Sequence, residues 1–290
     1  MDELIKQITL LNKSLERIAD FLSPSFDTSV LDTYRAFKCI SRSDRLILRG
    51  IPAPDPITFD EMIGIDEMIN ELRENTEQFL RDLPCNNALL YGPRGTGKSS
   101  VVKALLNTYG PAGLRMIEMP RDTLGHILDL AEILRNRSEK FIIFCDDLTY
   151  EEEDTSYLNI KTLLEGGIET RPSNMLIYAT SNRRHLMPEK IEEQQRDPKG
   201  ELHPEEAVEE KISFSDRFGL RLGFQYFDFD TYFAIVRNHA KIRKLRINAE
   251  ELRRLAMQWS ISHGSFSGRT ARQFTDSLEG RLRKQTWKKQ

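Results

Sequence analysis

One stretch of the sequence decides the fold: Gly92-Pro93-Arg94-Gly95-Thr96-Gly97-Lys98-Ser99. The apolar run Asn87–Tyr91 precedes it and predicts a strand, and apolar residues at helical spacing from Val101 to Leu106 follow it. The pattern GxxxxGKS between a strand and a helix is typical of a loop that binds phosphate groups. The sequence therefore predicts a nucleotide-binding α/β protein.

Each residue type in this loop has a chemical reason. Glycines let backbone N–H groups curl around phosphate oxygens, and the N-terminus of the following helix adds partial positive charge. We expect Lys98 to contact the β- and γ-phosphates and the Ser99 hydroxyl to bind Mg²⁺. The nucleotide-binding residues predicted in and beside the loop are Gly92, Pro93, Arg94, Gly95, Thr96, Gly97, Lys98, Ser99 and Ser100.

A second buried-type strand, Phe141–Asp146, ends in two neighbouring carboxylates, Asp146 and Asp147. Beside a phosphate-binding loop, we expect Asp146 to join Ser99 in holding Mg²⁺, as the acidic strand end does in P-loop NTPases. Asp147 is then the candidate to orient the attacking water. Asp is also common wherever a strand leads into a loop, so the assignment depends on the neighbouring loop.

Phosphoryl transfer also needs positive charge at the γ-phosphate and a polar group near the water. Three residues meet this need in chain order. Asn182 closes the apolar run that begins at residue 174, Arg217 stands just before the apolar run 221–227, and Arg269 opens the last predicted helix. Taken alone, Asn182 is more often a cap and Arg217 a surface ion-pair partner. Their order along the chain favours a catalytic set.

The ordered set resembles the AAA+ ATPase superfamily, and over Ile51 to Leu282 the sequence closely resembles a bacterial family of predicted AAA+ ATPases whose role is undefined. In this resemblance Gly92 to Ser99 match the Walker A motif, and Asp146 with Asp147 match Walker B. The resemblance implies a three-layer α/β core with a helical lid, and it implies ATP and Mg²⁺ as cofactors.

The same resemblance gives the downstream residues their roles. Asn182 matches sensor 1, Arg217 the arginine finger and Arg269 sensor 2 in the lid. The segment Thr58–Gly64 resembles the one that packs on adenine, which adds Ile63 and Gly64 to the cofactor-binding residues. The catalytic residues implied are Lys98, Asp147, Asn182, Arg217 and Arg269.

Two positions depart from the family pattern. Most members have Glu where this chain has Asp147, and a side chain one methylene shorter positions water differently. Arg272 lies three residues after Arg269 at the same helix start and competes with it for the sensor 2 role. We favour Arg269, because its distance from Gly268 better resembles the unfoldase branch.

The pattern along the chain predicts three parts: a helical N-terminal segment at residues 1–50, a nucleotide-binding core at 51–227 and a helical lid at 228–290. Apolar residues at helical spacing predict an N-terminal helix from Leu4 to Leu22, and a weaker helical stretch lies near Leu31 to Ile40. The prolines at 52, 54 and 56 mark a linker. An acidic stretch at 188–211 has no apolar periodicity.

The core sheet is expected to contain five parallel strands: Asn87–Tyr91, Arg115–Met119, Phe141–Asp146, Asn174–Thr180 and Arg221–Phe227.

Composition excludes some classes of protein and limits others. The sequence contains neither an apolar run of about 20 residues, which a membrane helix needs, nor an apolar signal core behind a basic start. Three cysteines without metal-ligand spacing favour a reducing compartment, and we expect a cytoplasmic protein. The five histidines form no ligand pair, and we expect surface or cap roles for them.

Charge is distributed unevenly. Residues 146–210 contain 17 acidic and 7 basic side chains, whereas residues 225–290 contain 6 acidic and 14 basic ones. This polarity is compatible with a head-to-tail homo-oligomer, with a nucleic-acid partner for the basic lid and tail, or with an ordinary solvated surface.

The leading hypothesis is a Mg²⁺-dependent AAA+ ATPase whose sites lie between subunits and whose turnover remodels or loads an unidentified protein partner. One alternative is a nucleotide-gated binding protein with negligible turnover, which Asp147 and the acidic stretch motivate. The other is a DNA-associated factor resembling helicase loaders. The sequence does not specify the partner, the ring size or the role of residues 1–50.

Overall fold

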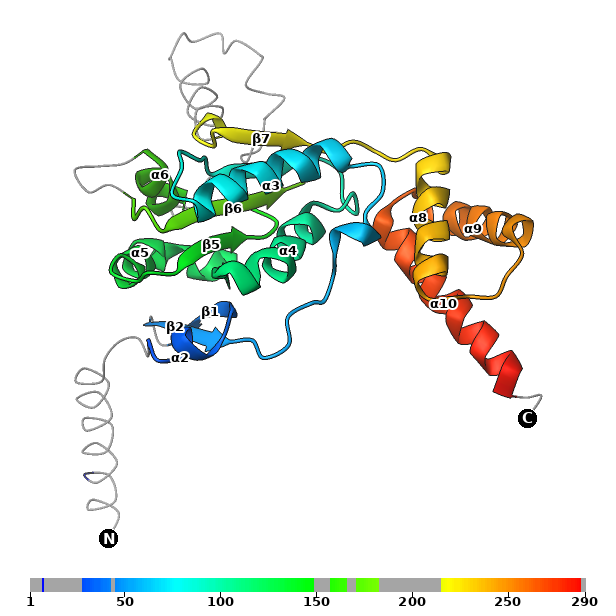
Figure 1. Cartoon of the computed structure of the whole chain (residues 1–290), viewed down its shortest axis with the longest axis horizontal. Helices are drawn as coiled ribbons and strands as arrows, with labels where there is room; N and C mark the ends of the chain where they lie inside the picture. The colour runs from blue at the N-terminus through cyan, green and yellow to red at the C-terminus, as the bar shows by residue number, and fades with distance from the viewer. Residues whose placement is uncertain are drawn as a thin grey trace.

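A computed structural model of the chain describes residues 28–42, 45–148, 157–165, 171–182 and 215–287, together with Gln7. Its centre is a seven-stranded sheet with the strand order β2-β1-β4-β5-β6-β3-β7 (Figure 1). Six strands are parallel, and only β2, at one edge, runs antiparallel to its neighbour. The strands are β1 (Ala36–Arg42), β2 (Arg45–Gly50), β3 (Ala88–Tyr91), β4 (Leu114–Glu118), β5 (Lys140–Cys145), β6 (Met175–Ser181) and β7 (Leu220–Gly223).

Helices cover both faces of this sheet, which is why its central strands are continuously apolar. All seven residues of β6 are buried, as are the last five of β5. One face packs on α3 and α4 and the other on α2, α5 and α6, so the core has the three layers expected. The helices of the core are α2 (Val30–Thr33), α3 (Asp66–Leu80), α4 (Lys98–Tyr109), α5 (Ile127–Leu134) and α6 (Tyr157–Glu165), with 3₁₀ turns η1 (Phe59–Glu61), η2 (Gly110–Ala112) and η3 (Arg121–His126).

The N-terminal part of the sheet corrects two expectations. The five expected strands are present as β3 to β7, but β1 and β2 form an additional hairpin that extends the sheet beyond β4. The helical stretch expected near Leu31 to Ile40 is wrong, because α2 ends at Thr33 and the chain is in a strand from Ala36. Phe37 and Cys39 point into the core while Lys38 and Ile40 point away, which is strand periodicity.

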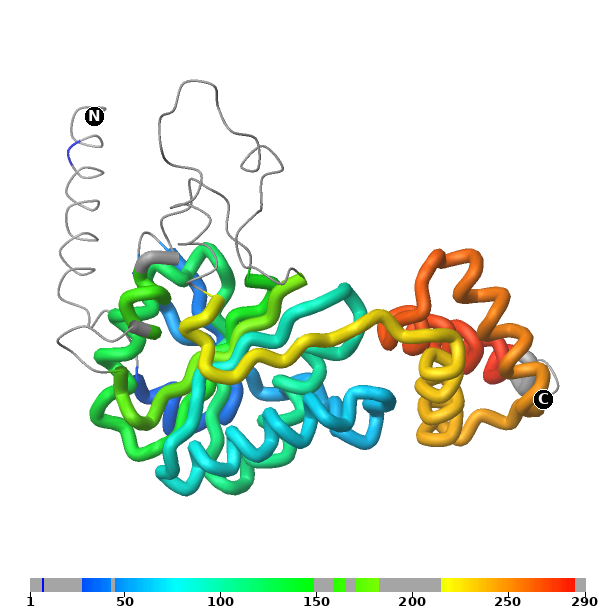
Figure 2. The backbone as a smooth tube through the Cα atoms, turned by 90° about the horizontal axis from the view of Figure 1, so that it is seen from above, coloured from blue at the N-terminus to red at the C-terminus, as the bar shows by residue number. Residues whose placement is uncertain are grey.

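Three helices follow the core, as expected: α8 (Phe229–Ile242), α9 (Ala249–His263) and α10 (Gly268–Trp287). Figure 2 shows them gathered at one end of the molecule, joined to the core by the segment after β7. Side chains of Asp228 and Asn248 accept hydrogen bonds from the first turns of α8 and α9, which fixes where these helices begin. A separate apolar cluster around Tyr232, Val236 and Phe274 holds the three together. We call this part the lid.

Some expectations fall outside the described residues: the helix from Leu4 to Leu22 and the acidic stretch at 188–211. The division at residues 50 and 227 stays a prediction, although the hairpin brings residues 36–50 into the core sheet. Within the described ranges, no helix combines the length and the apolar character that crossing a membrane requires.

Candidate active site

The phosphate-binding loop lies between the end of β3 and the start of α4, at the carboxyl edge of the sheet. Gly92 has φ +131°, and a Cβ atom there would lie 2.2 Å from the backbone oxygen of Phe224. Gly97, which precedes α4, has φ +102°. Both positions therefore require glycine, for space at Gly92 and for backbone conformation at both. The loop wraps the N-terminus of α4, where backbone N–H groups favour an anion.

Lys98 is buried beneath this loop. Its Nζ donates to the backbone oxygens of Gly92 and Pro93, each at 2.7 Å, and to Asn182 Oδ1 at 3.3 Å. Burial lowers the pKa of Lys98, and the nearby carboxylates of Asp147 and Asp146 oppose that shift. An ammonium group satisfied by neutral acceptors is suited to exchange them for phosphate oxygens, which form stronger charge-assisted bonds.

Two hydroxyl groups hold the carboxylate of Asp146. Ser99 Oγ and Thr180 Oγ1 each donate to Asp146 Oδ1 at 2.6 Å. Hydroxyl and carboxylate oxygens are the hard ligands that Mg²⁺ prefers, and Mg²⁺ needs few protein ligands because it keeps waters and substrate phosphates. Ser99 and Asp146 therefore fit a magnesium ion bound together with a nucleotide.

The neighbouring carboxylate is held by a different pair of contacts. Asp147 has φ +54°, which is unusual for a non-glycine residue. Its backbone N–H donates to Thr180 Oγ1 at 2.9 Å, and its Oδ1 accepts from the Asn182 amide. Asn182 thus bonds both to Lys98 and to Asp147, so the three residues form one connected polar group in the pocket.

These residues line one pocket with a volume of about 650 Å³. Its lining combines the loop, Lys98 and the acidic strand end with apolar side chains, those of Ile57, Met62, Ile235 and Phe227. The predicted site residues that line it are Ile63, Arg94, Gly95, Thr96, Gly97, Lys98, Ser99, Ser100, Asp146, Asp147, Asn182 and Arg269. A lining that offers both cationic and apolar groups suits a nucleotide, which has charged phosphates and an apolar base.

The other predicted residues have supporting positions. Gly92 and Pro93 supply the carbonyl oxygens that hold Lys98. Gly64, with φ +80°, lies beside Thr231 of the lid and follows the pocket residue Ile63.

The lid closes one side of the pocket through direct contact with the loop. The backbone N–H of Gly268 donates to the Gly95 oxygen at 2.8 Å, and the Asn238 side chain donates to the Asp60 oxygen at 2.6 Å. Arg269 and Arg272 both line the pocket, so the choice between them for sensor 2 stays open.

Arg217 is placed away from this pocket. It stands just before β7, which is parallel to β3, so it lies at the amino edge of the sheet while the loop lies at the carboxyl edge. Among the described residues that line the pocket, Arg217 is absent. A role for Arg217 in phosphoryl transfer therefore requires the pocket of another molecule.

The sequence analysis missed several pocket residues, and Thr180 and His239 are the two that bear on its chemistry. Thr180 bonds to both strand-end aspartates, and its signal was its position two residues before Asn182, on the same face of β6. His239 was expected at the surface or in a cap, which is wrong: it is 7% exposed, and it lines the pocket from α8. Burial lowers the pKa of His239, with Arg243 adding to that shift, and so favours the neutral imidazole.

Comparison with known proteins identifies the family and the fold of this chain. The model of a family described as "Protein of unknown function (DUF815)" matches residues 32–282. The chain belongs to the DUF815 family. Its motifs and fold also make this DUF815 protein an AAA+ P-loop protein, and its curated relatives agree with that assignment.

The relatives of this DUF815 chain match it only in part. Proteasome-activating nucleotidase 2 of Haloferax volcanii is 32% identical over 107 residues, which are 32% of this chain and 26% of the relative. The proteasome-activating nucleotidase of Methanopyrus kandleri is 28% identical over 122 residues, covering 37% and 28% of the two chains. The chain thus spans about a quarter of the length of these curated relatives.

Solved structures show the same fold. The Thermotoga maritima RuvB Holliday junction branch migration motor superposes with a TM-score of 0.54 at 17% identity, covering 78% of this chain and 65% of that one. Its A156S mutant gives a TM-score of 0.55, also at 17% identity, with coverage of 78% and 66%. At this identity the likeness concerns the AAA+ fold alone.

Proposed function

We propose that this protein is a Mg²⁺-dependent ATPase that acts as a homo-oligomer and couples ATP turnover to remodelling or loading of an unidentified protein partner. One observation carries the proposal: the connected group of Lys98, Asp147 and Asn182 lies in a pocket beside the Ser99–Asp146 pair. Charge, metal ligands and a water-orienting carboxylate are the parts that phosphoryl transfer requires.

Each residue has a distinct task in this proposal. Lys98 and the backbone N–H groups of the loop bind the phosphates, and Ser99 with Asp146 hold the metal ion. Mg²⁺ supplies charge neutralisation on the β- and γ-phosphate oxygens. Asp147 accepts a hydrogen bond from the attacking water, and Asn182 keeps the Asp147 side chain oriented by bonding to its Oδ1.

The position of Arg217 supports the oligomeric part of the proposal. Positive charge beside the γ-phosphate strongly accelerates the reaction, and Arg217 lies at the opposite edge of its own sheet. In a head-to-tail assembly the amino edge of one subunit faces the pocket of the next, so Arg217 acts on the neighbour's nucleotide. Such a heterologous contact closes into a ring when its rotation allows.

The test is steady-state ATP hydrolysis per subunit, measured with magnesium across a wide range of protein concentration. We expect the rate per subunit to rise with concentration, because the site is completed by a neighbour. The Lys98→Ala variant is the control for contaminating ATPases and should show no turnover. A finite wild-type rate that stays constant while sedimentation shows monomers becoming oligomers would refute the intersubunit site.

A second candidate function is a nucleotide-gated binding protein, and the observation that favours it is Asp147 itself. Its short side chain is tied to Asn182, and its backbone has positive φ, so it reaches less far toward a water than Glu would. In this case ATP binds tightly but a single-turnover experiment yields almost no ADP. Single-turnover rates in the ordinary enzymatic range, about 1 s⁻¹ or faster, would remove this candidate.

A further inference from the structure

One face of the β1–β2 hairpin carries cations that the nucleotide pocket does not use. Residues directly opposite each other in an antiparallel pair point to the same face of the sheet. The register of the hairpin therefore places three pairs on one surface, which we call the hairpin face: Lys38 with Arg49, Ile40 with Ile47, and Arg42 with Arg45.

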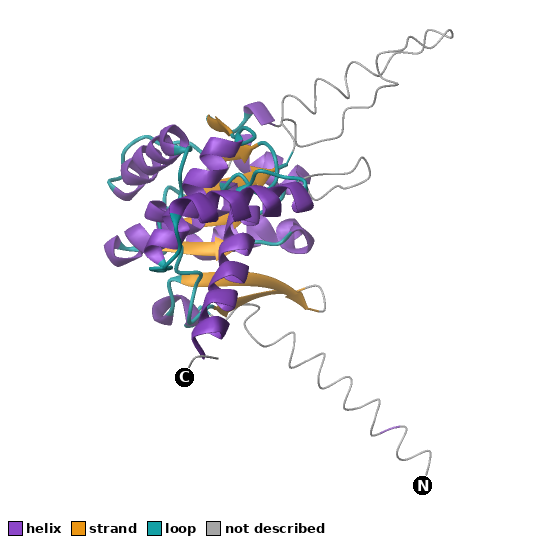
Figure 3. Ribbon diagram, turned by 90° about the vertical axis from the view of Figure 1, so that its right-hand side faces the viewer, coloured by secondary structure: helices purple, strands orange, loops and turns teal. Residues whose placement is uncertain are grey.

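The opposite side of the hairpin is anchored in the core. Phe37 and Cys39 of β1 are each 1% exposed, and Leu46 and Leu48 of β2 are buried in the same cluster. The hairpin face consequently turns outward: Arg42 and Arg49 are exposed, and Ile47 is 41% exposed. Figure 3 shows the two strands reaching beyond the neighbouring helices of the core. The hairpin thus presents a fixed two-stranded ribbon rather than a loose loop.

The charges on this ribbon oppose its own stability. Two of its three cross-strand pairs join like charges, which destabilises a sheet, whereas opposite charges at such positions stabilise it. Lys38 is neutralised by Glu118 at 2.6 Å, but within the described ranges Arg42 and Arg49 have no acidic partner. Exposed arginines that face like charges and have no acidic partner in the described part of the chain, as at Arg42 and Arg49, are expected where a surface has a function.

The spacing of the two cationic pairs suits a line of phosphates. Position 38 and position 42 are four residues apart on β1, which is about 13 Å at roughly 3.3 Å per residue. Measured along the helix axis, at roughly 3.4 Å per nucleotide, a duplex rises by about four nucleotides over that length. Three of the four cations are arginines, whose planar fork bonds phosphate with two donors, and a groove of B-DNA admits a two-stranded ribbon.

We propose that the hairpin face is a nucleic-acid binding site that contacts the phosphate backbone through Arg42, Arg49 and their neighbours, independently of base sequence. The whole chain has a formal charge of −3, so general attraction does not account for such binding. Ile40 and Ile47 lie between the cationic pairs and add apolar surface for sugars and bases. This site is separate from the nucleotide pocket, and the proposal does not depend on ATP turnover.

The experiment measures binding of the full chain to fluorescein-labelled 20-mer DNA, single-stranded and duplex, by anisotropy at a series of salt concentrations. The Arg42→Gln/Arg49→Gln variant should weaken binding at about 50 mM salt by at least 10-fold. The slope of log K against log salt should fall by about 2, because roughly one unit is lost per phosphate contact. The Arg42→Lys/Arg49→Lys variant should retain most of the slope, because it keeps both charges.

A matched control removes two exposed arginines elsewhere, Arg81→Gln/Arg254→Gln, and should bind nearly as wild type. The hairpin variant should melt no lower than wild type, because it relieves like-charge repulsion. The proposal fails if wild type does not bind at low salt, or if the hairpin variant binds as wild type. It also fails if the control loses as much affinity, or if polyglutamate displaces the probe at lower concentration than unlabelled DNA, because the face would then accept an acidic protein.

Discussion

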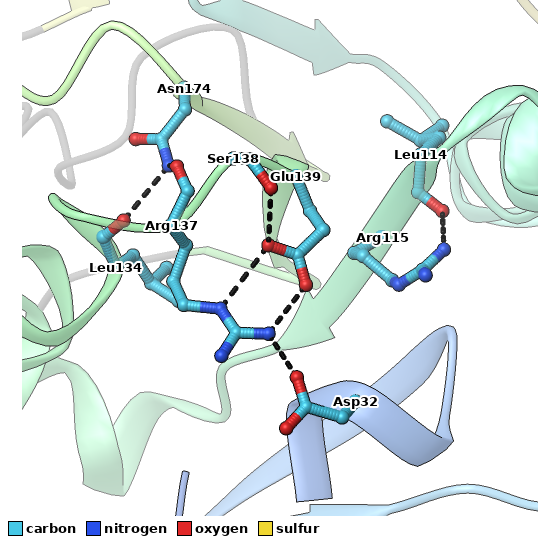
Figure 4. A network of polar contacts seen from close by, with 8 residues as sticks. All are labelled: Asp32, Leu114, Arg115, Leu134, Arg137, Ser138, Glu139 and Asn174. Carbon is cyan, nitrogen blue, oxygen red and sulfur yellow. Dashed lines mark hydrogen bonds and ion pairs between the residues drawn. The ribbon is translucent and has the colours of Figure 1, made fainter. Parts of the chain in front are cut away.

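Charged side chains at the two edges of the central sheet have different kinds of hydrogen-bond partner. At the carboxyl edge, Lys98 is buried yet donates to neutral acceptors, and Asp146 and Asp147 accept from hydroxyl, backbone N–H and amide groups. At the amino edge, Arg137 bonds to Glu139 and to Asp32 of α2 (Figure 4). The charges of Arg137, Glu139 and Asp32 satisfy one another, whereas those at the carboxyl edge are satisfied by neutral groups that a ligand can replace.

This difference indicates that the amino edge stabilises the fold and that the carboxyl edge is suited to bind a ligand. The amino-edge network joins α2 to the ends of α5 and β6: the Asn174 side chain donates to the Leu134 and Arg137 oxygens, each at 2.8 Å. Arg137 holds the pKa of Glu139 below its usual range, which identifies a mutually stabilised pair. Arg217 also lies at this edge, and its proposed role is at the nucleotide of another subunit.

The largest effect is expected from Arg217→Ala, which tests whether the amino edge has a function in trans. ATP affinity should stay close to wild type, while turnover should fall by about 10³-fold, as for loss of an arginine finger. Arg221→Ala is the matched control, because Arg221 is a nearby exposed arginine that pairs with Asp216. It should keep most of the activity.

Oligomers that mix two inactive variants test whether Arg217 completes the site of a neighbouring subunit. A Lys98→Ala subunit cannot bind nucleotide but still carries Arg217. An Arg217→Ala subunit keeps an intact pocket but lacks the arginine. Mixing the two inactive variants should restore turnover, because some interfaces then combine an intact pocket with an intact arginine. An inactive mixture, in subunits shown to co-assemble, would place Arg217 outside the reaction.

A smaller effect is expected from Thr180→Val, within the carboxyl edge. The change keeps the shape but removes the bond to Asp146 and the acceptor for the Asp147 N–H, each worth about 1 kcal/mol. Both bonds position catalytic carboxylates, so kcat should fall by roughly 10-fold with little change in KM. Thr180→Ser should restore kcat because it keeps the hydroxyl.

Thr123→Val is the control for loss of a buried hydroxyl. Thr123 is fully buried, and its Oγ1 donates to the Pro120 oxygen at 2.7 Å. That variant should lose stability but keep kcat. An equal loss of kcat in both variants would mean that Thr180 acts only through stability.

The sequence predicted the parts of the site that a motif marks, including Asp146 and Asn182, and missed residues that only the topology brings to the pocket. Gly92 to Ser99 are contiguous in the sequence and have a characteristic spacing, so a local pattern identified them. Thr180 and His239 reach the pocket from β6 and α8; only the position of Thr180 two residues before Asn182 marks it, and no neighbouring motif marks His239. The hairpin was missed for a related reason. The alternation of Phe37 and Cys39 with Lys38 and Ile40 is short, and no sequence motif marks its partner strand.

The smallest effect is expected from Arg137→Met, which tests whether the amino-edge network contributes only stability. Its side chain is 25% exposed, so solvent weakens the pair, and we expect a loss of about 1 kcal/mol and 2–4 °C in Tm. ATP affinity should not change. Arg254→Met, which breaks an exposed pair within α9, is the control and should cost less than about 0.5 kcal/mol.

The pH dependence of the stability difference between wild type and Arg137→Met distinguishes the ion pair from side-chain packing. Because the pKa of Glu139 is lowered in the folded chain, its pairing stabilises the protein above the ordinary carboxyl pKa of about 4.3 and is lost as pH falls through the folded value. Urea titrations of wild type and Arg137→Met should therefore differ fully at pH 7 and converge below about pH 4. A difference in unfolding free energy that stays constant across this range would assign the effect to packing of the Arg137 stem rather than to the ion pair.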